Sequence, residues 1–338
     1  MKLSRRRVAV LFVGFVEIFL IIALLLLITG KAKSLIPDPQ YAIHLKSDHY
    51  RTVIKSDRFP HYYEPQPDTV INDHPVWLGE HVSYSINHDG LNERMDYPVA
   101  RVPGVNRIIT LGDSFTYGLF VNTTENYSER LEDLLNSEVC KENGESFEVI
   151  NLGVPAYDIG YAAERYRLRG TKYHPDLVIW WFNSFTMGID AERKTALEEQ
   201  YLNEIPEGDR WRTVDGKEQF YPGMLAWLTH TKEATLEKRE MRQAFYLREF
   251  LQSFEGSLLI VANDWDTWSA SSRKALTSAL LYRDNVRLLP VSKLLRRGET
   301  LLADEHPNRE GHRRMANLLY ETLLDMRLLP CLNTHLDE

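Results

Sequence analysis

The sequence predicts an α/β domain with a parallel sheet and helices on both of its faces, preceded by one transmembrane helix. Two observations predict this class. Residues 8–29 are apolar apart from one glutamate, and about 20 such residues are enough to cross a bilayer. From Arg107 onward, short β-branched runs alternate with helical stretches, which is typical of a parallel sheet. We therefore divide the chain into a start and anchor (1–30), a juxtamembrane linker (31–75) and one domain (76–338).

The apolar run has more basic residues before it than after it. Those before it are Lys2, Arg5, Arg6 and Arg7, and those after it are Lys31 and Lys33. The positive-inside rule then places the amino terminus in the cytoplasm and the rest of the chain outside it. A cleaved signal peptide is the alternative, but the run exceeds the ~7–15 apolar residues of such peptides and no clear cleavage site follows it. Glu17 within the run either faces a partner helix or is a protonated carboxyl.

The composition of the chain argues against two kinds of site. A formal net charge of −8, without a cluster of Lys and Arg, argues against nucleic acid as a partner because phosphate binding needs a basic face. Cys140 and Cys331 are the only cysteines, and two isolated cysteines make no metal site. They either pair outside the cytoplasm or remain separate thiols. The sequence therefore predicts no metal and no cofactor, and it indicates nothing about protein partners.

Residues between the predicted anchor and the first buried strand form two different patterns. Residues 31–75 are rich in Pro, Asp, His and Tyr without sustained periodicity, which is typical of a linker. Val82 to Ile86 alternate between apolar and polar residues, and Asn87 to Gly90 supply turn chemistry. We therefore expect an edge hairpin that covers the sheet.

Five apolar runs predict the strands of the sheet. They are RIITL at 107, FEVIN at 147, DLVIWWF at 176, SLLIVA at 257 and VRLLPV at 286. The stretches between them carry apolar stripes at helical spacing, which predict helices that pack on the sheet. Residues 186–250 are too long for an ordinary loop, so we expect a helical insertion that caps the domain.

A Gly-Asp-Ser triplet follows the first of these strands. Ser114 stands just past the end of that strand, and ligands of open α/β sheets bind at this edge. By itself such a triplet is more often turn chemistry than catalysis. A serine nucleophile also needs a general base, a group that orients the base, and donors for an oxyanion.

His306 is the candidate base because it lies in a loop after the fifth strand. Pro307 prevents a helix at this point, and Asn308 can cap the last helix, so the imidazole lies at the same edge as the nucleophile. Asp304 or Glu305 can accept a hydrogen bond from the other ring nitrogen. We favour Asp304 because a residue two before the histidine can fold back toward its ring.

Candidate donors for an oxyanion follow the second and third strands. The backbone N–H groups from Gly153 to Ala156 lie before a predicted helix and face the same edge. Asn183 follows the third strand, and its carboxamide can donate to an oxyanion. Trp180 and Trp181 beside it either stack on sugar rings or fill the core, and central strands favour the core.

Together, these motifs resemble the SGNH hydrolase family, also called GDSL esterases and lipases, in its membrane-anchored bacterial type. The resemblance covers about residues 107–326 and rests on four motifs, which are GDS at 112, NLGVPAY at 151, WWFNS at 180 and DEHPN at 304. It implies a three-layer α/β/α sandwich around a five-stranded parallel sheet, the flavodoxin-like SGNH fold. It also implies Ser114 as nucleophile, His306 as base, and an oxyanion hole made by Ser114 N–H, a backbone N–H of the second motif and Asn183.

Three motifs depart from the family pattern. Ala156 stands where the family has glycine, and its N–H can serve as a donor if its φ is negative. Trp181 replaces a glycine in the third motif, and Ser184 replaces an acid. In the last motif Ala303 occupies the usual position of the acid, which leaves Asp304 as its substitute.

We predict a serine esterase that hydrolyses small, acetyl-like esters on a cell-surface glycan, outside the cytoplasm. Transfer of the acyl group to a polysaccharide is one alternative, because the same acyl-enzyme supports both reactions. A module that only binds glycan is the other, because three of the four motifs are incomplete. The expected partners are an ester or acylated glycan substrate and, through the amino-terminal helix, a membrane.

Overall fold

The computed structural model describes residues 50–51, 54–75, 77–138, 144–196, 212–214, 217–219, 236–281 and 283–329. The predicted span at 8–29 with Glu17, and both Cys140 and Cys331, lie outside these residues. Within the described part of the chain, no helix is both long and apolar enough for a membrane crossing. The anchor and the pairing of the cysteines therefore stay predictions.

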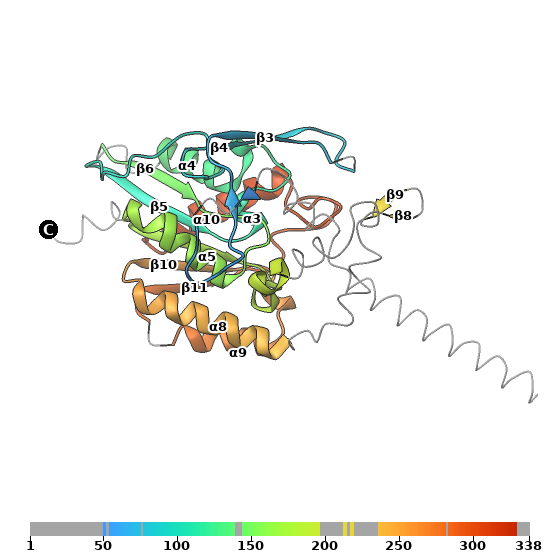
Figure 1. Cartoon of the computed structure of the whole chain (residues 1–338). Coiled ribbons are helices and arrows are strands. Elements are labelled where there is room, and N and C mark those ends of the chain that lie inside the picture. The colour runs from blue at the N-terminus through green and yellow to red at the C-terminus, as the bar shows by residue number, and fades with distance from the viewer. Residues whose placement is uncertain are drawn as a thin grey trace, which may run out of the picture. The chain divides into compact units, whose positions relative to one another are not determined.

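A five-stranded parallel sheet forms the centre of the domain (Figure 1). Its strands are β5 (Val105–Leu111), β6 (Ser146–Asn151), β7 (Leu177–Phe182), β10 (Ser257–Ala262) and β11 (Val286–Pro290). They lie in the order β11-β10-β7-β5-β6, and all neighbours are parallel. This is the flavodoxin-like doubly wound order, in which the direction of winding reverses between β5 and β7. The predicted strands and sheet are confirmed.

Helices cover both faces of this sheet and bury alternate side chains of each strand. On one face lie α4 (Tyr127–Glu138) and α10 (Arg309–Asp325), which pack on Ile108, Val149, Ile179, Trp181 and Leu259. On the other lie α5 (Ile159–Arg165), α8 (Leu236–Ser253) and α9 (Ala270–Ala279), which pack on Ile109, Ile150, Trp180, Phe182 and Ile260. Each fully buried side chain of this size contributes roughly 1.5–3 kcal/mol to the hydrophobic stabilisation. The predicted three-layer sandwich is confirmed.

The amino-terminal part of the domain begins earlier than the predicted boundary at residue 76. Phe59, Tyr62 and Tyr63 are buried in the core, although the pattern of residues 31–75 predicted a linker. The aromatic residues that break the periodicity pack individually on α5, as Tyr62 does on Tyr161 at 5.6 Å between ring centroids. Single anchors of this kind leave no periodic signal in the sequence.

The predicted hairpin exists with a different partner strand. β4 (Val82–Ile86) pairs antiparallel with β3 (Thr69–Asp73), which precedes it. The turn at 87–90 instead leads to a single bridge between Ile86 and Asn92. Two shorter strands, β1 (Tyr50–Arg51) and β2 (Glu64–Pro65), also pair. The turn at 87–90 was predicted correctly, but the strand that pairs with β4 was not.

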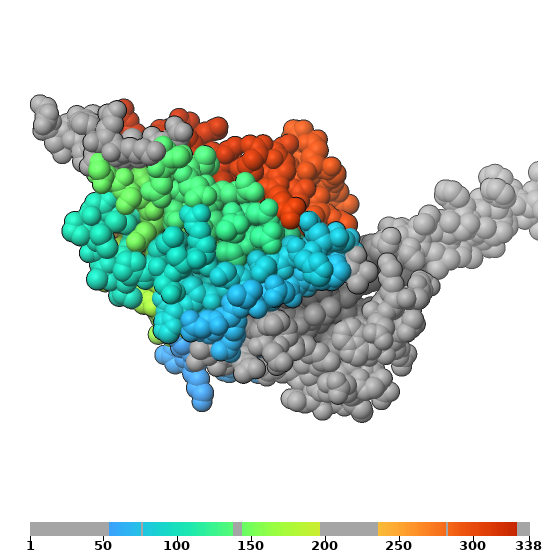
Figure 2. Space-filling model, turned by 90° about the horizontal axis from the view of Figure 1, so that it is seen from above, coloured from blue at the N-terminus to red at the C-terminus, as the bar shows by residue number. Residues whose placement is uncertain are grey.

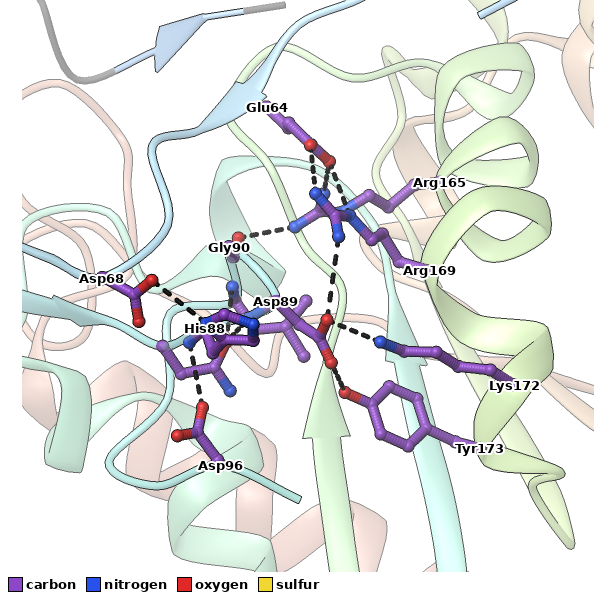
Figure 3. A network of polar contacts seen from close by, with 12 residues as sticks. Glu64, Asp68, His88, Asp89, Gly90, Asp96, Arg165, Arg169, Lys172 and Tyr173 are labelled. Atoms are coloured by element: carbon purple, nitrogen blue, oxygen red, sulfur yellow. Dashed lines mark hydrogen bonds and ion pairs between the residues drawn. The ribbon is translucent and has the colours of Figure 1, made fainter. Parts of the chain in front are cut away.

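A network of ion pairs fixes this segment to α5 and to the turns that follow it (Figure 3). Glu64 is fully buried, and its carboxylate accepts hydrogen bonds from Arg165 and from Arg169 at 2.5 Å. In the same network, Asp89 pairs with Lys172 at 2.5 Å. Buried ion pairs add little net stability, but removal of one partner leaves an uncompensated charge and costs about 3–5 kcal/mol. The network therefore holds the segment in one position.

The predicted insertion at 186–250 divides into different parts. Its last part is α8, which packs on α5 and α9 and belongs to the helical layer between β7 and β10. Its first part holds a 3₁₀ turn at Thr186–Gly188 and helical residues 191–196. Two short antiparallel strands, β8 (Arg212–Val214) and β9 (Lys217–Gln219), belong to a separate compact unit. A purely helical cap was therefore the wrong expectation for the described residues.

Side chains protect the free edge of β6, one of the two edge strands of the sheet. Asn136 accepts from Phe147 N–H at 2.9 Å, Glu132 accepts from Val149 N–H at 2.8 Å, and Glu93 accepts from Asn151 N–H. An unpaired edge is a site of unwanted strand pairing, which these acceptors prevent. Burial and the neighbouring Glu129 carboxylate raise the pKa of Glu93 well above its ordinary value.

We expect Glu93→Gln to stabilise the domain at pH 8 by about 1 kcal/mol or more. Because the folded-state pKa of Glu93 lies above its unfolded value, the stabilisation from its neutral form is complete below the unfolded pKa. It is lost as the pH rises through the folded pKa. Glutamine remains neutral and keeps an acceptor for Asn151. Urea unfolding at pH 5 and pH 8 measures the difference, with Glu321→Gln, an exposed carboxylate on α10, as control. An equal change in stability at both pH values would contradict this account.

Candidate active site

Ser114 begins a short helix directly after β5. Asp113 caps this helix, α3 (Ser114–Tyr117), because its carboxylate accepts from Phe115 N–H at 2.9 Å. Gly118 ends it with a φ of 84°, a conformation that glycine adopts without strain. Ser114 is 1% exposed. The sequence predicted a tight turn here but not the helix, which is too short to show periodicity.

Gly153 allows the loop after β6 to pack directly on α3. A Cβ atom at this position would lie 2.4 Å from Tyr117 N and 2.6 Å from Thr116 C, which are both backbone atoms. Its N–H donates to the Asn151 side chain at 2.9 Å. Gly153 therefore serves close packing, and its N–H is already used, which argues against the predicted role as an oxyanion donor.

The structure brings Ser114, His306 and Asp304 into one chain of hydrogen bonds. His306 Nε2 lies 2.9 Å from Ser114 Oγ, and His306 Nδ1 lies 2.8 Å from Asp304 Oδ2. The Asp304 carboxylate also accepts from His306 N–H at 3.2 Å. Glu305 turns away with a φ of 75° and pairs with Arg297. Of the two carboxylates that the sequence left open, Asp304 is the one that contacts the imidazole.

The loop that carries His306 is held at both of its ends. His306 O accepts from Leu302 N–H at 2.8 Å, and Asn308 caps α10 by accepting from Gly311 N–H at 2.9 Å. The imidazole ring lies between two aromatic contacts, Phe120 at 5.2 Å and Phe115 at 5.6 Å. With Asp304 accepting from Nδ1–H, Nε2 carries the lone pair that faces the serine. This arrangement suits a base that accepts a proton from Ser114.

The Asn183 side chain is fixed by groups from three neighbouring strand ends. Its Nδ2 donates to Asp113 at 3.1 Å, and its Oδ1 accepts from Trp181 Nε1 at 3.3 Å and from Asn263 Nδ2 at 3.2 Å. Burial raises the pKa of Asp113, while the hydrogen bonds from Phe115 and Asn183 lower it. The amide orientation is thus set by donors on one side and an acceptor on the other.

The contributions of Asn263 and Trp181 to this network were not predicted from the sequence. Asn263 follows β10 directly, so it lies at the same edge as the predicted residues, and this position is the signal that could have found it. Trp181 lies two residues before Asn183 in β7, and its indole N–H donates to Asn183 Oδ1. Trp180 and Trp181 are each 1% exposed, so the structure supports the core interpretation over stacking on sugars.

Ala156 does not meet the condition set for it from the sequence. Its φ is 64°, in the left-handed region, where an L-residue other than glycine costs roughly 1–2 kcal/mol. The expectation of a negative φ was wrong. The loop after β6 imposes the backbone conformation that a glycine would adopt, so the direction of the Ala156 N–H follows the loop and not the residue type.

His312 lies inside the first turn of α10 and takes no part in this chain of contacts. It is fully buried and stacks on Tyr127 at 6.2 Å between ring centroids. Burial, with Arg130 and His306 nearby, lowers the pKa of His312 to about 3. Among the described residues, no group of His, Cys, Asp and Glu side chains is arranged to hold a metal ion.

Neither a family model nor a curated protein matches this chain. Similar solved structures include an esterase of two domains that is active on acetylated mannans, at 15% identity and a TM-score of 0.41, covering 66% of this chain and 50% of that one. A psychrotrophic esterase from Pseudoalteromonas sp. has 13% identity and a TM-score of 0.41, covering 66% and 98%. A catalytic mutant of an acetylxylan esterase from Geobacillus stearothermophilus has 13% identity and a TM-score of 0.38, covering 64% and 93%. Because these values are low, the chemistry of this chain has to be inferred from its own side chains.

We expect Asp304→Asn to keep the fold and to lower the turnover of an activated ester by up to about 10⁴-fold. The amide would favour the wrong imidazole tautomer, so Nε2 would no longer accept the serine proton. Glu305→Gln is the matched control and is expected to change turnover little, because Glu305 contacts Arg297. Steady-state kinetics and circular dichroism of both variants test this. Equal, small effects would indicate a dyad of Ser114 and His306.

We expect Ala156→Gly to raise the free energy of unfolding by up to about 1 kcal/mol. Relief of the left-handed conformation, about 1–2 kcal/mol, exceeds the roughly 0.4–1 kcal/mol of extra entropy in the unfolded chain. Ala163→Gly, inside α5, is the control and should lower stability by about 1 kcal/mol or more. Denaturant unfolding compares the variants. A loss of stability at residue 156 as large as that at residue 163 would show that no strain is present.

Proposed function

We propose that this protein is a serine esterase that hydrolyses small acyl esters through Ser114, His306 and Asp304. The observation that carries the proposal is the unbroken chain of hydrogen bonds from the serine hydroxyl through the imidazole to the Asp304 carboxylate. Ser114 and His306 are 192 residues apart in the sequence. Local turn chemistry explains each residue by itself but not their common alignment.

In the proposed reaction, Ser114 Oγ attacks the ester carbonyl carbon while its proton passes to His306 Nε2. The carbonyl oxygen becomes an oxyanion, and the proposed donors to it are Ser114 N–H, Ala156 N–H and Asn183 Nδ2. The imidazolium then donates its proton to the leaving alkoxide, and the alcohol departs. A water molecule then attacks the carbonyl carbon of the acyl-enzyme while its proton passes to His306 Nε2. The bond between this carbon and Ser114 Oγ breaks, and the imidazolium returns the proton to Ser114 Oγ. The carboxylic acid departs, and the serine is restored.

Burial of the reacting groups supports a small acyl group. Ser114 and Asn183 are 1% and 2% exposed, and Phe115, which touches His306, is 7% exposed. A bulky acyl chain next to these atoms would have to displace packed aromatic side chains. An acetyl-like group is the size that we propose, and an O-acetylated glycan is the proposed source of the ester.

Ser114 should react with a fluorophosphonate probe, which phosphonylates activated serines. The unaltered chain is expected to be labelled at Ser114, and Ser114→Ala should lose the label while it stays folded. Ser137→Ala, an exposed serine on α4, is the control and should remain labelled. A folded, unlabelled protein would overturn the esterase and favour a binding module. Product analysis with and without an acceptor glycan then separates hydrolysis from acyl transfer.

We also propose that residues 8–29 anchor the protein with its domain outside the cytoplasm. The excess of basic residues before this run supports that orientation. Alkaline phosphatase fused after residue 338 should be active in bacterial cells, whereas a fusion after residue 7 should be inactive. The reverse pattern would place the domain inside.

A further inference from the structure

Two partly exposed aromatic side chains each lie one ring away from the His306 imidazole. Trp77 packs on Phe120 at 5.0 Å between ring centroids, and Phe120 lies 5.2 Å from His306. Phe185 packs on Phe115 at 6.3 Å, and Phe115 lies 5.6 Å from His306. Trp77 is 37% exposed and Phe185 is 42% exposed. Large aromatic groups are therefore presented to solvent beside a deeply buried nucleophile.

The loop between β3 and β4 holds Trp77 in its place. Glu80 pairs with Arg309 at 2.9 Å, and Arg309 is the first residue of α10, three positions after His306. In the middle of β4, Tyr84 Oη accepts from Phe120 N–H at 2.8 Å. In Figure 2 the blue surface of this hairpin adjoins the orange and red surface of residues near 300. Trp77 thus belongs to a surface that is fixed next to the histidine loop.

The proposed reaction determines which part of a substrate meets these rings. The leaving alkoxide must receive its proton from His306 Nε2, so the alcohol part of the ester lies beside the imidazole. Trp77 packs on Phe120 and Phe185 packs on Phe115, and each of these inner rings contacts the imidazole. The acyl part faces the buried side, where Ser114 and Asn183 lie. The exposed rings are therefore available to the alcohol.

The surroundings of the two rings favour a carbohydrate as that alcohol. Polar groups accompany both of them: His74, Glu80 and His81 in the hairpin loop, and Ser184 beside Phe185. A long aliphatic chain would call for an enclosed and continuous apolar lining. Sugar rings instead combine apolar C–H faces, which stack on the electron-rich face of an aromatic ring, with hydroxyl groups that need polar neighbours.

We propose that Trp77 and Phe185 form a carbohydrate-binding platform that holds the sugar part of the ester during the reaction. The proposal rests on the proposed esterase function for the direction of the substrate. It assigns to the β3–β4 loop, which lies outside the four motifs, a direct part in substrate selection.

Kinetics of Trp77→Ala and Phe185→Ala in the full chain test the platform. The substrates are a panel of acetylated β-1,4-linked oligosaccharides of xylose, mannose and N-acetylglucosamine, together with p-nitrophenyl acetate and p-nitrophenyl octanoate. We expect kcat/KM on the oligosaccharides accepted by the unaltered chain to fall about tenfold or more, mainly through KM. Activity on p-nitrophenyl acetate should stay within about twofold. Phe245→Ala, a 51% exposed phenylalanine on α8, is the matched control and should change neither activity.

A parallel fall on p-nitrophenyl acetate would show that the rings only support the site and would overturn the platform. A selective fall on p-nitrophenyl octanoate would assign the rings to an acyl chain and would also overturn it. Calorimetric binding of the non-acetylated oligosaccharides to Ser114→Ala separates the two proposals. Binding that Trp77→Ala weakens supports the platform even if no ester is hydrolysed. Hydrolysis of p-nitrophenyl acetate without binding of any panel member refutes the platform and leaves the esterase intact.

Discussion

All five strands of the sheet run in one direction, and the site depends on this constraint. Parallel strands end at the same edge, so the loops after β5, β7, β10 and β11 meet there although they are far apart in the sequence. The winding reverses between β5 and β7, the position at which ligands of open α/β sheets bind. Ser114 follows β5 and Asn183 follows β7. Ser114 and the Asn183 amide therefore stand on the two sides of this reversal.

Asp113 connects the helix α3, which follows β5, to Asn183, which follows β7. Its carboxylate caps α3, which aims Ser114, and also accepts from Asn183 Nδ2 at 3.1 Å. A buried carboxylate is costly unless donors surround it, so the hydrogen bonds that satisfy Asp113 also fix its neighbours. The opposite end of the Asn183 amide is held by Trp181 and Asn263. One buried carboxylate thus fixes the positions of both Ser114 and the Asn183 amide.

The amino-terminal segment completes the site from outside the sheet. Phe120 contacts His306 and has a φ of 69°, which costs about 1–3 kcal/mol for a non-glycine residue. Tyr84 of β4 accepts its N–H, and Trp77 packs on its ring. The surrounding contacts hold this conformation. The ion pairs of Glu64 and Asp89 then fix the segment to α5 and the turns after it.

The sequence by itself determined the features that depend on neighbouring residues. Period and β-branching predicted all five strands, and the strand ends predicted where Ser114, Asn183 and His306 stand. The short distance along the chain also favoured Asp304 as the partner of His306. These features follow from local propensity, and a parallel sheet converts strand ends into one common edge.

Only the tertiary structure decided the features that depend on contacts across many residues. Asn183 contacts Asn263 across 80 positions, and Asn151 contacts Glu93 across 58. The φ of Ala156 follows the path of its loop, and the aromatic anchors of residues 59–63 pack singly on α5. Neither leaves a periodic pattern. The physical reason is that packing and hydrogen bonding at these positions act between segments brought together by the sheet, so no local window of sequence contains both partners.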